Sequence, residues 1–386
     1  MTGDPMADSM TFREMNLRVF EGRPVPGVLF QPRFEPWFEY RQRLGDLPES
    51  LQKGTVFDAY DTLDVSMRYI HYATGCPSPV EVFHETPLRV TERTDGNGMR
   101  VTVHETPYGD LVTRYGFASD GSCRVVEFPV RTAEDLRRLE WVFRHTRYVY
   151  NPEGFAHGAA RMGDRGEPQF YVCRSPYQCL SLEWMAYDDF VTALLFEPEQ
   201  VGPVLAAMDA AHDPLYEGLA ADPAPRIVNF GENIDGRLMS PDLFERHHLP
   251  FYEKRDACLK AAGKFTHAHF DGSFHSLLPF FPRLPFDGIE ALTPVPQGDA
   301  TLEEIREHLG DKVLLDGIPA VFFLPEFPLE RLQECVERLV ALFAPRLVLG
   351  ISDELPMGAG PEAVERLLWV RDYCRNCAPR PAPESV

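Results

Sequence analysis

Two histidines separated by a single residue form the strongest chemical signal in the sequence. His267 and His269 lie in the segment KFTHAHF, which is typical of a strand, and His275 follows shortly afterwards. Because strand residues two apart point to the same side, both imidazoles would face one site. Zinc binds imidazole nitrogens at about 2.0–2.1 Å, so the pair predicts a metal site. Hydrogen bonding of the two rings to neighbouring carboxylates is an equally supported interpretation.

A metal site needs at least one further ligand, and polar residues follow several other predicted strands. We expect at least one of Glu232 and Asp353 to complete the ligand set, leaving one position open for substrate or water. Capping of the following helix is an alternative role for Asp353 and Glu354. The full set of polar residues at predicted strand ends is Cys173, Arg174, Glu232, Asn233, Asp235, His267, His269, Asp271, Glu290, Asp316, Ser352, Asp353 and Glu354.

The elements that position these residues alternate between strands and helices from Gln169 onward. Such alternation is typical of a parallel sheet, and active sites of parallel barrels lie at the carboxyl ends of the strands. Six strands are predicted there, one more spans Pro26–Pro32, and a weaker one lies near Met67–Tyr72, so eight strands predict a TIM (β/α)8 barrel. The six are QFYVC, RIVNF, KFTHAHF, DGIEAL, KVLLDGI and RLVLGIS.

A different pattern occupies residues 80–130, where hydrophobicity alternates with period two between the turn sequences DGNG, PYGD and SDGS. This pattern predicts an antiparallel β meander appended near the first barrel units. The expected organisation is an N-terminal arm over residues 1–23, one barrel domain over residues 24–378 with the meander as an insertion, and a tail over residues 379–386. Trp37, Phe38 and the meander turns are expected to wall the mouth of the barrel.

Composition excludes several classes of partner. The chain has 386 residues with 38 Lys and Arg against 59 Asp and Glu, giving a net charge of -21 that disfavours nucleic acid and anionic membranes. No apolar run is long enough to span a bilayer, and the first residues lack the pattern of a secretory signal. Eight scattered cysteines, including the CRNC segment near the C-terminus, indicate a reduced, cytoplasmic protein.

Four segments resemble the uroporphyrinogen decarboxylase superfamily, which includes cobalamin-linked methyltransferases. They are ETPYGDLV with RTAEDLRRL, SPYQCLSLEWMAYDDFVTALLFEPEQV, GENIDGRLMSPDLFERHHLPFY, and the run from HAHFDGSFHSLLPFF to DGIEALTPVPQGDATLEEIREHLGDKVLLDGI. The resemblance covers most of the chain from Pro26 to Tyr373, and its last run is similar to a decarboxylase-like branch. It implies a TIM barrel and often a homodimer.

The chain departs from the family pattern at two places. The Arg-rich substrate loop of true uroporphyrinogen decarboxylases is absent from QPRFEPWFEYRQR, and the zinc-binding His-x-Cys and Cys-Gly of the methyltransferases are replaced by His267, His269 and LVLGIS. Any metal would therefore have nitrogen and oxygen ligands.

The resemblance implies a metal-dependent methyltransferase, with zinc or another divalent metal, that moves a methyl group between a small methylated substrate and a corrinoid protein. Asp271 and Glu232 would act as general acid or orient the imidazoles. The expected substrate contacts are Arg174, Tyr177, Trp37, Asn233 and His275. One alternative is decarboxylation of a small acid held by Arg174 or Arg237, and another is non-catalytic binding of a tetrapyrrole-type ligand.

Overall fold

Seven parallel strands build the main sheet of the protein. The structure is a computed structural model that describes residues 10–117 and 123–378. The strand order is β1-β13-β12-β11-β10-β9-β8. The seven strands coincide with seven of the eight predicted ones: β1 (Leu29–Phe30), β8 (Tyr171–Val172), β9 (Ile227–Phe230), β10 (Phe265–His269), β11 (Gly288–Glu290), β12 (Val313–Ile318) and β13 (Leu347–Ile351).

The eighth predicted strand, near Met67–Tyr72, is reduced to a single bridge. Tyr69 pairs in parallel with Gln169, just before β8, and the Ser66 amide donates to the Phe30 carbonyl of β1 at 3.0 Å. Residues 66–70 therefore hydrogen-bond to the chain at both edge strands of the sheet.

Contacts divide the described chain into two compact units. Unit 1 comprises residues 10–79, 152–172 and 223–378 and holds the parallel sheet, whereas unit 2 comprises residues 80–151 and 173–222 apart from 118–122. The single domain over residues 24–378 remains a prediction, and the tail at 379–386 lies outside the described residues.

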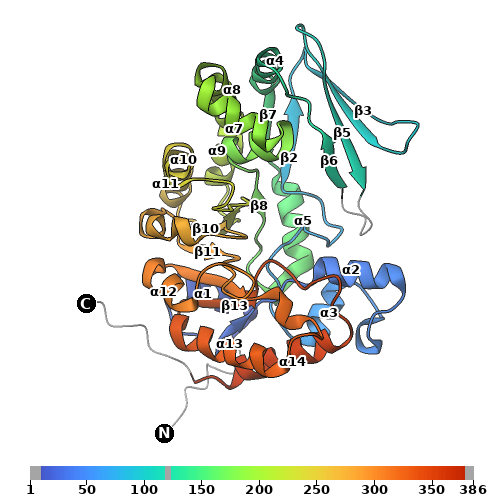
Figure 1. The fold of residues 1–386 in the computed structure, drawn as a ribbon. Coiled ribbons are helices and arrows are strands. Elements are labelled where there is room, and N and C mark those ends of the chain that lie inside the picture. Colours follow the sequence, from blue (N-terminus) through green and yellow to red (C-terminus); the bar gives the residue numbers. More distant parts are fainter. Residues whose placement is uncertain (1–9, 118–122, 379–386) are drawn as a thin grey trace. The chain divides into compact units, whose positions relative to one another are not determined.

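The helices of unit 1 follow the strands and bury one face each. In α13, Leu332, Val336, Leu339 and Phe343 recur every three to four residues and are buried, and this helix contacts β12 and β13 (Figure 1). The helices of this unit are α1 (Phe12–Phe20), α2 (Glu35–Leu44), α3 (Val56–Leu63), α5 (Pro152–Met162), α10 (Pro241–His247), α11 (Leu249–Ala261), α12 (Leu302–Leu309), α13 (Leu329–Phe343) and α14 (Glu362–Asn376).

Helix α1 corrects the prediction of a loosely held N-terminal arm for residues 10–23, whereas residues 1–9 of that arm lie outside the described residues. Thr11 caps the helix in a capping box with Glu14, and the helix buries Met15, Val19 and Phe20. These side chains form one cluster with residues at the starts of strands: Leu29, Ile227, Val313 and Val348. Helix α1 therefore covers the amino end of the sheet, opposite the end where the predicted site lies.

We expect Val19→Ala to lower the free energy of unfolding by about 2 kcal/mol, because a buried valine loses its transfer energy and leaves a cavity. Val19 is 1% exposed. Urea unfolding followed by circular dichroism measures this change. Val126→Ala is the matched control, since Val126 is 53% exposed. Equal effects of the two substitutions would show that α1 does not contribute to the core.

Unit 2 contains the predicted meander. Its sheet has the order β3-β4-β5-β6, with antiparallel pairing throughout. The turns DGNG and PYGD lie between strands as predicted, whereas SDGS falls outside the described residues. The strands are β3 (Arg89–Thr94), β4 (Arg100–Glu105), β5 (Leu111–Phe117) and β6 (Cys123–Glu127), with a separate antiparallel pair β2 (Val80–His84) and β7 (Thr146–Tyr150). The helices are α4 (Ala133–Arg144), α6 (Pro176–Cys179), α7 (Tyr187–Phe196), α8 (Pro198–Ala211) and α9 (Asp213–Ala221).

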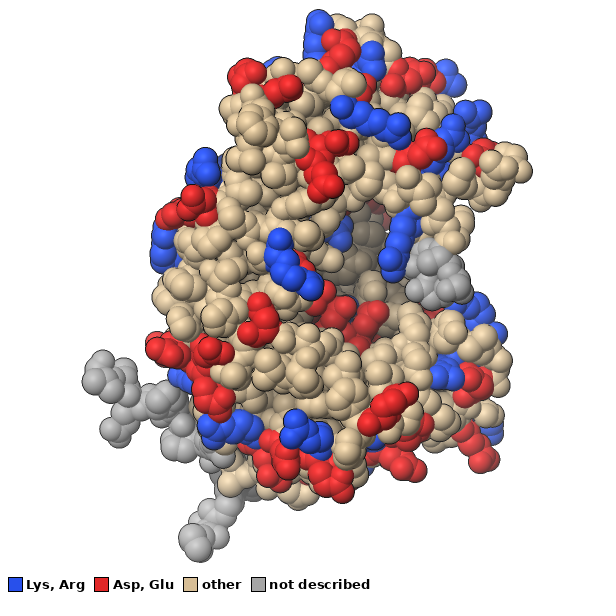
Figure 2. Space-filling view, viewed as in Figure 1, with Lys and Arg blue, Asp and Glu red and all other residues tan. Residues whose placement is uncertain are grey.

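Acidic and basic side chains both lie on the surface of the protein. On the face in view, Figure 2 shows Lys and Arg side chains interspersed with Asp and Glu side chains. None of the helices in the described chain combines the length and apolar character needed to cross a membrane.

Two buried histidines, His104 and His248, and the half-buried His71 predict loss of stability in mild acid. Burial lowers the pKa of His71 and His104 to about 4 and that of His248 to about 3, from an ordinary value of 6.5. Between pH 6.5 and about 4, these histidines bind protons in the unfolded chain but not in the folded chain. Stability should therefore fall as the pH drops from 6.5 toward 4, by up to about 1.4 kcal/mol per pH unit for each histidine.

Urea unfolding at several pH values between 7 and 4 measures this slope. His104→Phe keeps an aromatic ring against Trp184, whose centroid lies 4.9 Å away, and should give a shallower slope. Equal slopes for His104→Phe and the parent would contradict the assignment of a neutral, buried His104.

Candidate functional site

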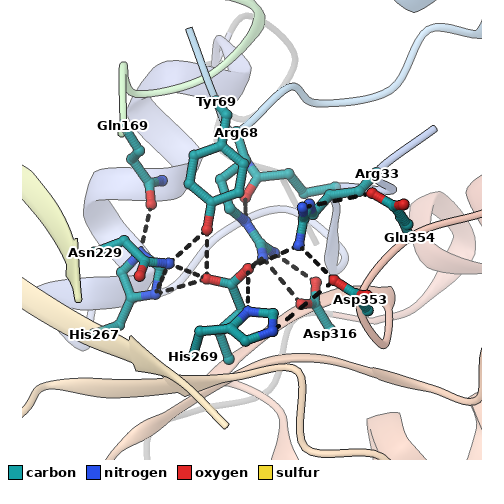
Figure 3. Close-up of polar contacts among 12 residues, drawn as sticks. Arg33, Arg68, Tyr69, Gln169, Asn229, His267, His269, Asp316, Asp353 and Glu354 are labelled. Carbon is teal, nitrogen blue, oxygen red and sulfur yellow. Dashed lines mark hydrogen bonds and ion pairs between the residues drawn. The ribbon is translucent and has the colours of Figure 1, made fainter. Parts of the chain in front are cut away.

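A buried carboxylate, Glu290, lies at the centre of the polar cluster at the carboxyl end of the sheet. Glu290 ends β11 and is 0% exposed. Its Oε2 accepts hydrogen bonds from the Tyr69 hydroxyl at 2.5 Å and from the Asn229 amide, and lies 3.1 Å from His267 Nδ1 (Figure 3). Three strand ends and the 66–70 segment thus meet at one oxygen.

The other oxygen of Glu290 faces the positive groups of the cluster. Its Oε1 lies 3.3 Å from Arg33 Nη1, 3.2 Å from Arg68 Nη1 and 3.4 Å from His269 Nδ1. Burial alone would raise the pKa of Glu290, but the charge of Arg68 and the hydrogen bonds of His267 and His269 hold it well below its ordinary value. Glu290 is therefore ionised and acts as the fixed negative centre of the cluster.

Arg33 and Arg68 each pair with further carboxylates in addition to Glu290. Arg68 forms a bidentate ion pair with Asp316 of β12, with Nη2 2.7 Å from Oδ1 and Nη1 3.0 Å from Oδ2. Arg33 pairs with Asp353 at 3.3 Å and Glu354 at 3.8 Å, just after β13. Arg68 and Asp316 are fully buried, whereas the side chains of Asp353 and Glu354 are 46% and 24% exposed. The accessible edge of the cluster is therefore acidic.

A chain of side-chain amides fixes the tautomer of His267. The Arg68 Nε–H donates to Gln31 Oε1 at 2.8 Å, so Gln31 Nε2 is the donor to Asn16 Oδ1 at 3.4 Å. Gln169 Nε2 also donates to Asn16 Oδ1, at 3.0 Å, which leaves Gln169 Oε1 to accept from His267 Nε2 at 2.9 Å. His267 Nε2 therefore carries a hydrogen and has no lone pair for a metal.

The expected zinc ligands do not fit a metal in this arrangement. His267 Nδ1 already contacts Glu290, and His269 Nε2 lies 3.9 Å from Asp353 Oδ1. The guanidinium groups of Arg33 and Arg68 lie against Glu290 Oε1, and their positive charge would repel a metal ion there. Glu232 is buried after β9, but within residues 10–117 and 123–378 no group of three or more His, Cys, Asp or Glu side chains is arranged to hold a metal ion. We therefore derive no chemistry from a metal here.

His269 and Asp271 belong to the accessible edge. Burial opposes a charge on His269, but the hydrogen bond and charge of Glu290, together with the charge of Asp353, raise its pKa above its ordinary value. Burial raises the pKa of Asp271, and the charge of Asp353 adds to this increase. Both groups therefore keep a proton to a higher pH than the same groups do in water.

Several expected substrate contacts lie elsewhere. His275 is exposed, and its Nε2 lies 3.3 Å from Oε1 of Glu304 in α12. Trp37 is 1% exposed and its indole N–H donates to the Ala359 carbonyl, and Phe38 is also buried, so neither ring is open to a ligand. Asn233 is exposed just after Glu232.

The arginines expected to hold a substrate carboxylate are already paired. Arg174 lies in unit 2, where its Nη1 donates to Glu183 at 2.8 Å, and Tyr177 is buried there against Phe190. Arg237 pairs with Asp235 at 2.6 Å.

The sequence interpretation missed the residues that surround Glu290 from the first part of the chain. Arg33, Arg68 and Tyr69 were not considered, nor were the amides of Gln169 and Asn229. One signal was available: Arg33 follows the apolar run of the first strand directly, at the position where polar residues follow the other strands.

Backbone strain is concentrated at the same edge. Ala291, Asp316 and Asp353 have φ values of 66°, 76° and 68°, a left-handed region that residues other than glycine rarely adopt. Ala291 and Asp353 lie just after β11 and β13, and Asp316 lies within β12, two residues before its end. Such conformations cluster at functional sites, where the surrounding contacts hold them in place.

Comparisons with known proteins show the fold but no family. No protein-family model matches the chain, and no curated protein matches its sequence. Among solved structures, a methyltransferase from Methanosarcina mazei is similar with a TM-score of 0.54 and 15% identity, covering 94% of this chain and 99% of that one. A putative vitamin-B12 independent methionine synthase from Listeria monocytogenes has a TM-score of 0.44 and 12% identity, covering 91% and 96%. At these identities the first likeness shows a shared α/β fold, and the superfamily inferred from the sequence remains a prediction.

Proposed function

We propose that this protein is a methyltransferase that takes a methyl group from a small methylated substrate and passes it to a nucleophilic acceptor, for which a corrinoid protein is the expected partner. The observation that carries the proposal is the polar cluster around Glu290 at the carboxyl end of a parallel sheet. The fold shared with a methyltransferase supports it.

Two layers of the cluster have different roles in this proposal. Glu290, Arg68 and Asp316 are fully buried and act as a rigid frame, because each is held by several ionic contacts. Asp353 and His269 form the layer that meets the substrate. The frame holds His269 at its Nδ1 and leaves Nε2 facing the accessible side.

Methyl transfer requires that the atom losing the methyl group accept the electron pair of the broken bond. A leaving group departs readily if it is protonated as it leaves or if it is already cationic. His269, whose pKa is raised by Glu290 and Asp353, would serve as a proton donor at the accessible edge. No step here depends on zinc, whose expected ligands are otherwise engaged.

The competing proposal of decarboxylation has less support. A decarboxylase would need a cation free to hold the substrate carboxylate, whereas Arg33, Arg174 and Arg237 each pair with carboxylates of the chain. The accessible edge is acidic and would repel an anionic substrate.

We also propose that the parallel strands close into a barrel through residues 66–70. The Tyr69–Gln169 bridge and the Ser66–Phe30 hydrogen bond support closure, because they join this segment to the chain at both edges of the sheet. Formation of a homodimer stays a prediction.

Transfer of labelled methyl groups tests the function directly. The protein is incubated with compounds carrying ¹³C-methyl on nitrogen, oxygen or sulfur, with cob(I)alamin as the acceptor, and the label is followed by NMR. We expect the label to leave at least one class of substrate. Retention of the label in every compound would contradict the proposal.

A further inference from the structure

An apolar cavity of about 190 Å³ lies within unit 1, between helix α1, the start of β1, the end of α3 and helix α14. Most of its walls are core side chains. They include Met15, Val28, Phe30, Val65 and Cys374, each at most 8% exposed. The cavity therefore enters the hydrophobic core beside α1, whereas the Glu290 cluster lies at the opposite, carboxyl end of the sheet.

Hydrogen bonds hold the segments around the cavity in place. The Val28 amide donates to the Cys374 carbonyl at 3.0 Å, which ties the chain entering β1 to the last turn of α14. Arg371 Nη1, one turn earlier on α14, donates to the Leu63 carbonyl at the end of α3, at 2.9 Å. Because three of the four segments are joined in this way, the cavity is preformed, as ligand sites usually are.

The charged groups at the rim of the cavity compensate one another. Arg375 Nη2 donates to the Asp64 carbonyl at 3.0 Å and also pairs with the Asp64 carboxylate. Arg371 pairs with Asp372, the next residue of α14, at 2.8 Å. A charged ligand would lose its hydration here and would have to displace one of these pairs. A water molecule inside would have few polar partners, since the walls are apolar.

We propose that this cavity binds a small uncharged molecule built on one aromatic ring. A cavity of about 150 Å³ lined by apolar side chains holds benzene, so 190 Å³ has room for one ring with a few additional atoms. The rings of Phe12 and Phe30 and the sulfur atoms of Met15 and Cys374 belong to residues that line the cavity. Sulfur–aromatic and ring–ring contacts favour an aromatic ligand over an aliphatic one.

This inference goes beyond the proposed methyl transfer and does not depend on it. The cavity shares no residue with the polar cluster around Glu290. A ligand bound here would stabilise the folded chain, because it binds the native state and not the unfolded one.

Three fluorinated probes that share one ring test the ligand class. Fluorobenzene, para-fluorobenzoate and para-fluorobenzylammonium are each titrated with the full chain and followed by ¹⁹F NMR. We expect fluorobenzene to bind at least about tenfold more tightly than either charged probe. Tighter binding of the benzoate or of the ammonium compound, or no binding of any probe, would overturn the inference.

Two substitutions in the walls locate the site. Val28→Phe places a second ring in the cavity and should weaken fluorobenzene binding at least about tenfold. Phe12→Ala shortens a half-buried side chain and should weaken binding about threefold to tenfold, which keeps the test available if Val28→Phe does not fold. Val126→Phe is the matched control, since Val126 is 53% exposed in unit 2. Parent-like binding by folded Val28→Phe or Phe12→Ala protein would place the ligand elsewhere and refute the assignment.

One further comparison excludes the ends of the chain as the occupant. Proteins lacking residues 1–9 or residues 379–386 should bind fluorobenzene within about threefold of the full chain if the cavity is open to a ligand. Binding that appears only after one of these segments is removed would overturn the inference and assign the cavity to that segment.

Discussion

Replacing Glu290 with glutamine is expected to lower the free energy of unfolding by about 3–5 kcal/mol, because it leaves Arg33 and Arg68 buried without their shared anion. Their side chains are 7% and 0% exposed. The amide Nε2 of glutamine, itself a donor, would also meet the hydroxyl donor of Tyr69. Urea unfolding at pH 7 measures the change.

A surface glutamate provides the control for this effect. Glu303 pairs with Arg338, and its side chain is 56% exposed, so Glu303→Gln should change stability by less than about 1 kcal/mol. Similar small effects at Glu290 and Glu303 would mean that the cluster around Glu290 is solvated rather than buried.

The second large effect is expected at Arg68. Arg68→Met should cost about 3–5 kcal/mol, because Asp316 and Glu290 would then be two carboxylates in a buried site. Combining it with Asp316→Asn should recover part of this loss, with a coupling energy of about 1–3 kcal/mol in a double-mutant cycle. The asparagine keeps the size of Asp316 and tolerates its positive φ of 76°.

Additive effects of the two substitutions would contradict a direct ion pair between Arg68 and Asp316. Since the cycle compares four proteins unfolded in the same way, a general loss of stability cancels from the coupling energy.

Strong apolar runs explain why most of the fold was predictable. The segments of β12 and β13 are short and mostly apolar, and each forms a strand within its predicted range. The segment near Met67–Tyr72 was the weakest prediction, and it forms one bridge rather than a strand. Helix α1 was missed because its few apolar residues gain their burial only from strand residues distant in the chain, such as Ile227 and Val348.

The site was predictable only in part, for a physical reason. Strand alternation correctly indicates that His267 and His269 lie near a common partner, and that partner is Glu290, which agrees with the alternative of hydrogen bonding to a carboxylate. The direction of each hydrogen bond depends on contacts between residues as distant as Arg68 and Gln169. No local pattern encodes such contacts, so the hydrogen bond from His267 Nε2 to Gln169 Oε1 can be recognised only in the folded structure.

The most direct test of the central claim is single-turnover demethylation of compounds that carry ¹³C-methyl on nitrogen, oxygen or sulfur. With cob(I)alamin as acceptor, we expect at least one class of compound to lose its labelled methyl group, with one demethylated product formed for each methyl group transferred. Complete recovery of every labelled compound would contradict the assignment of methyl transfer to this protein.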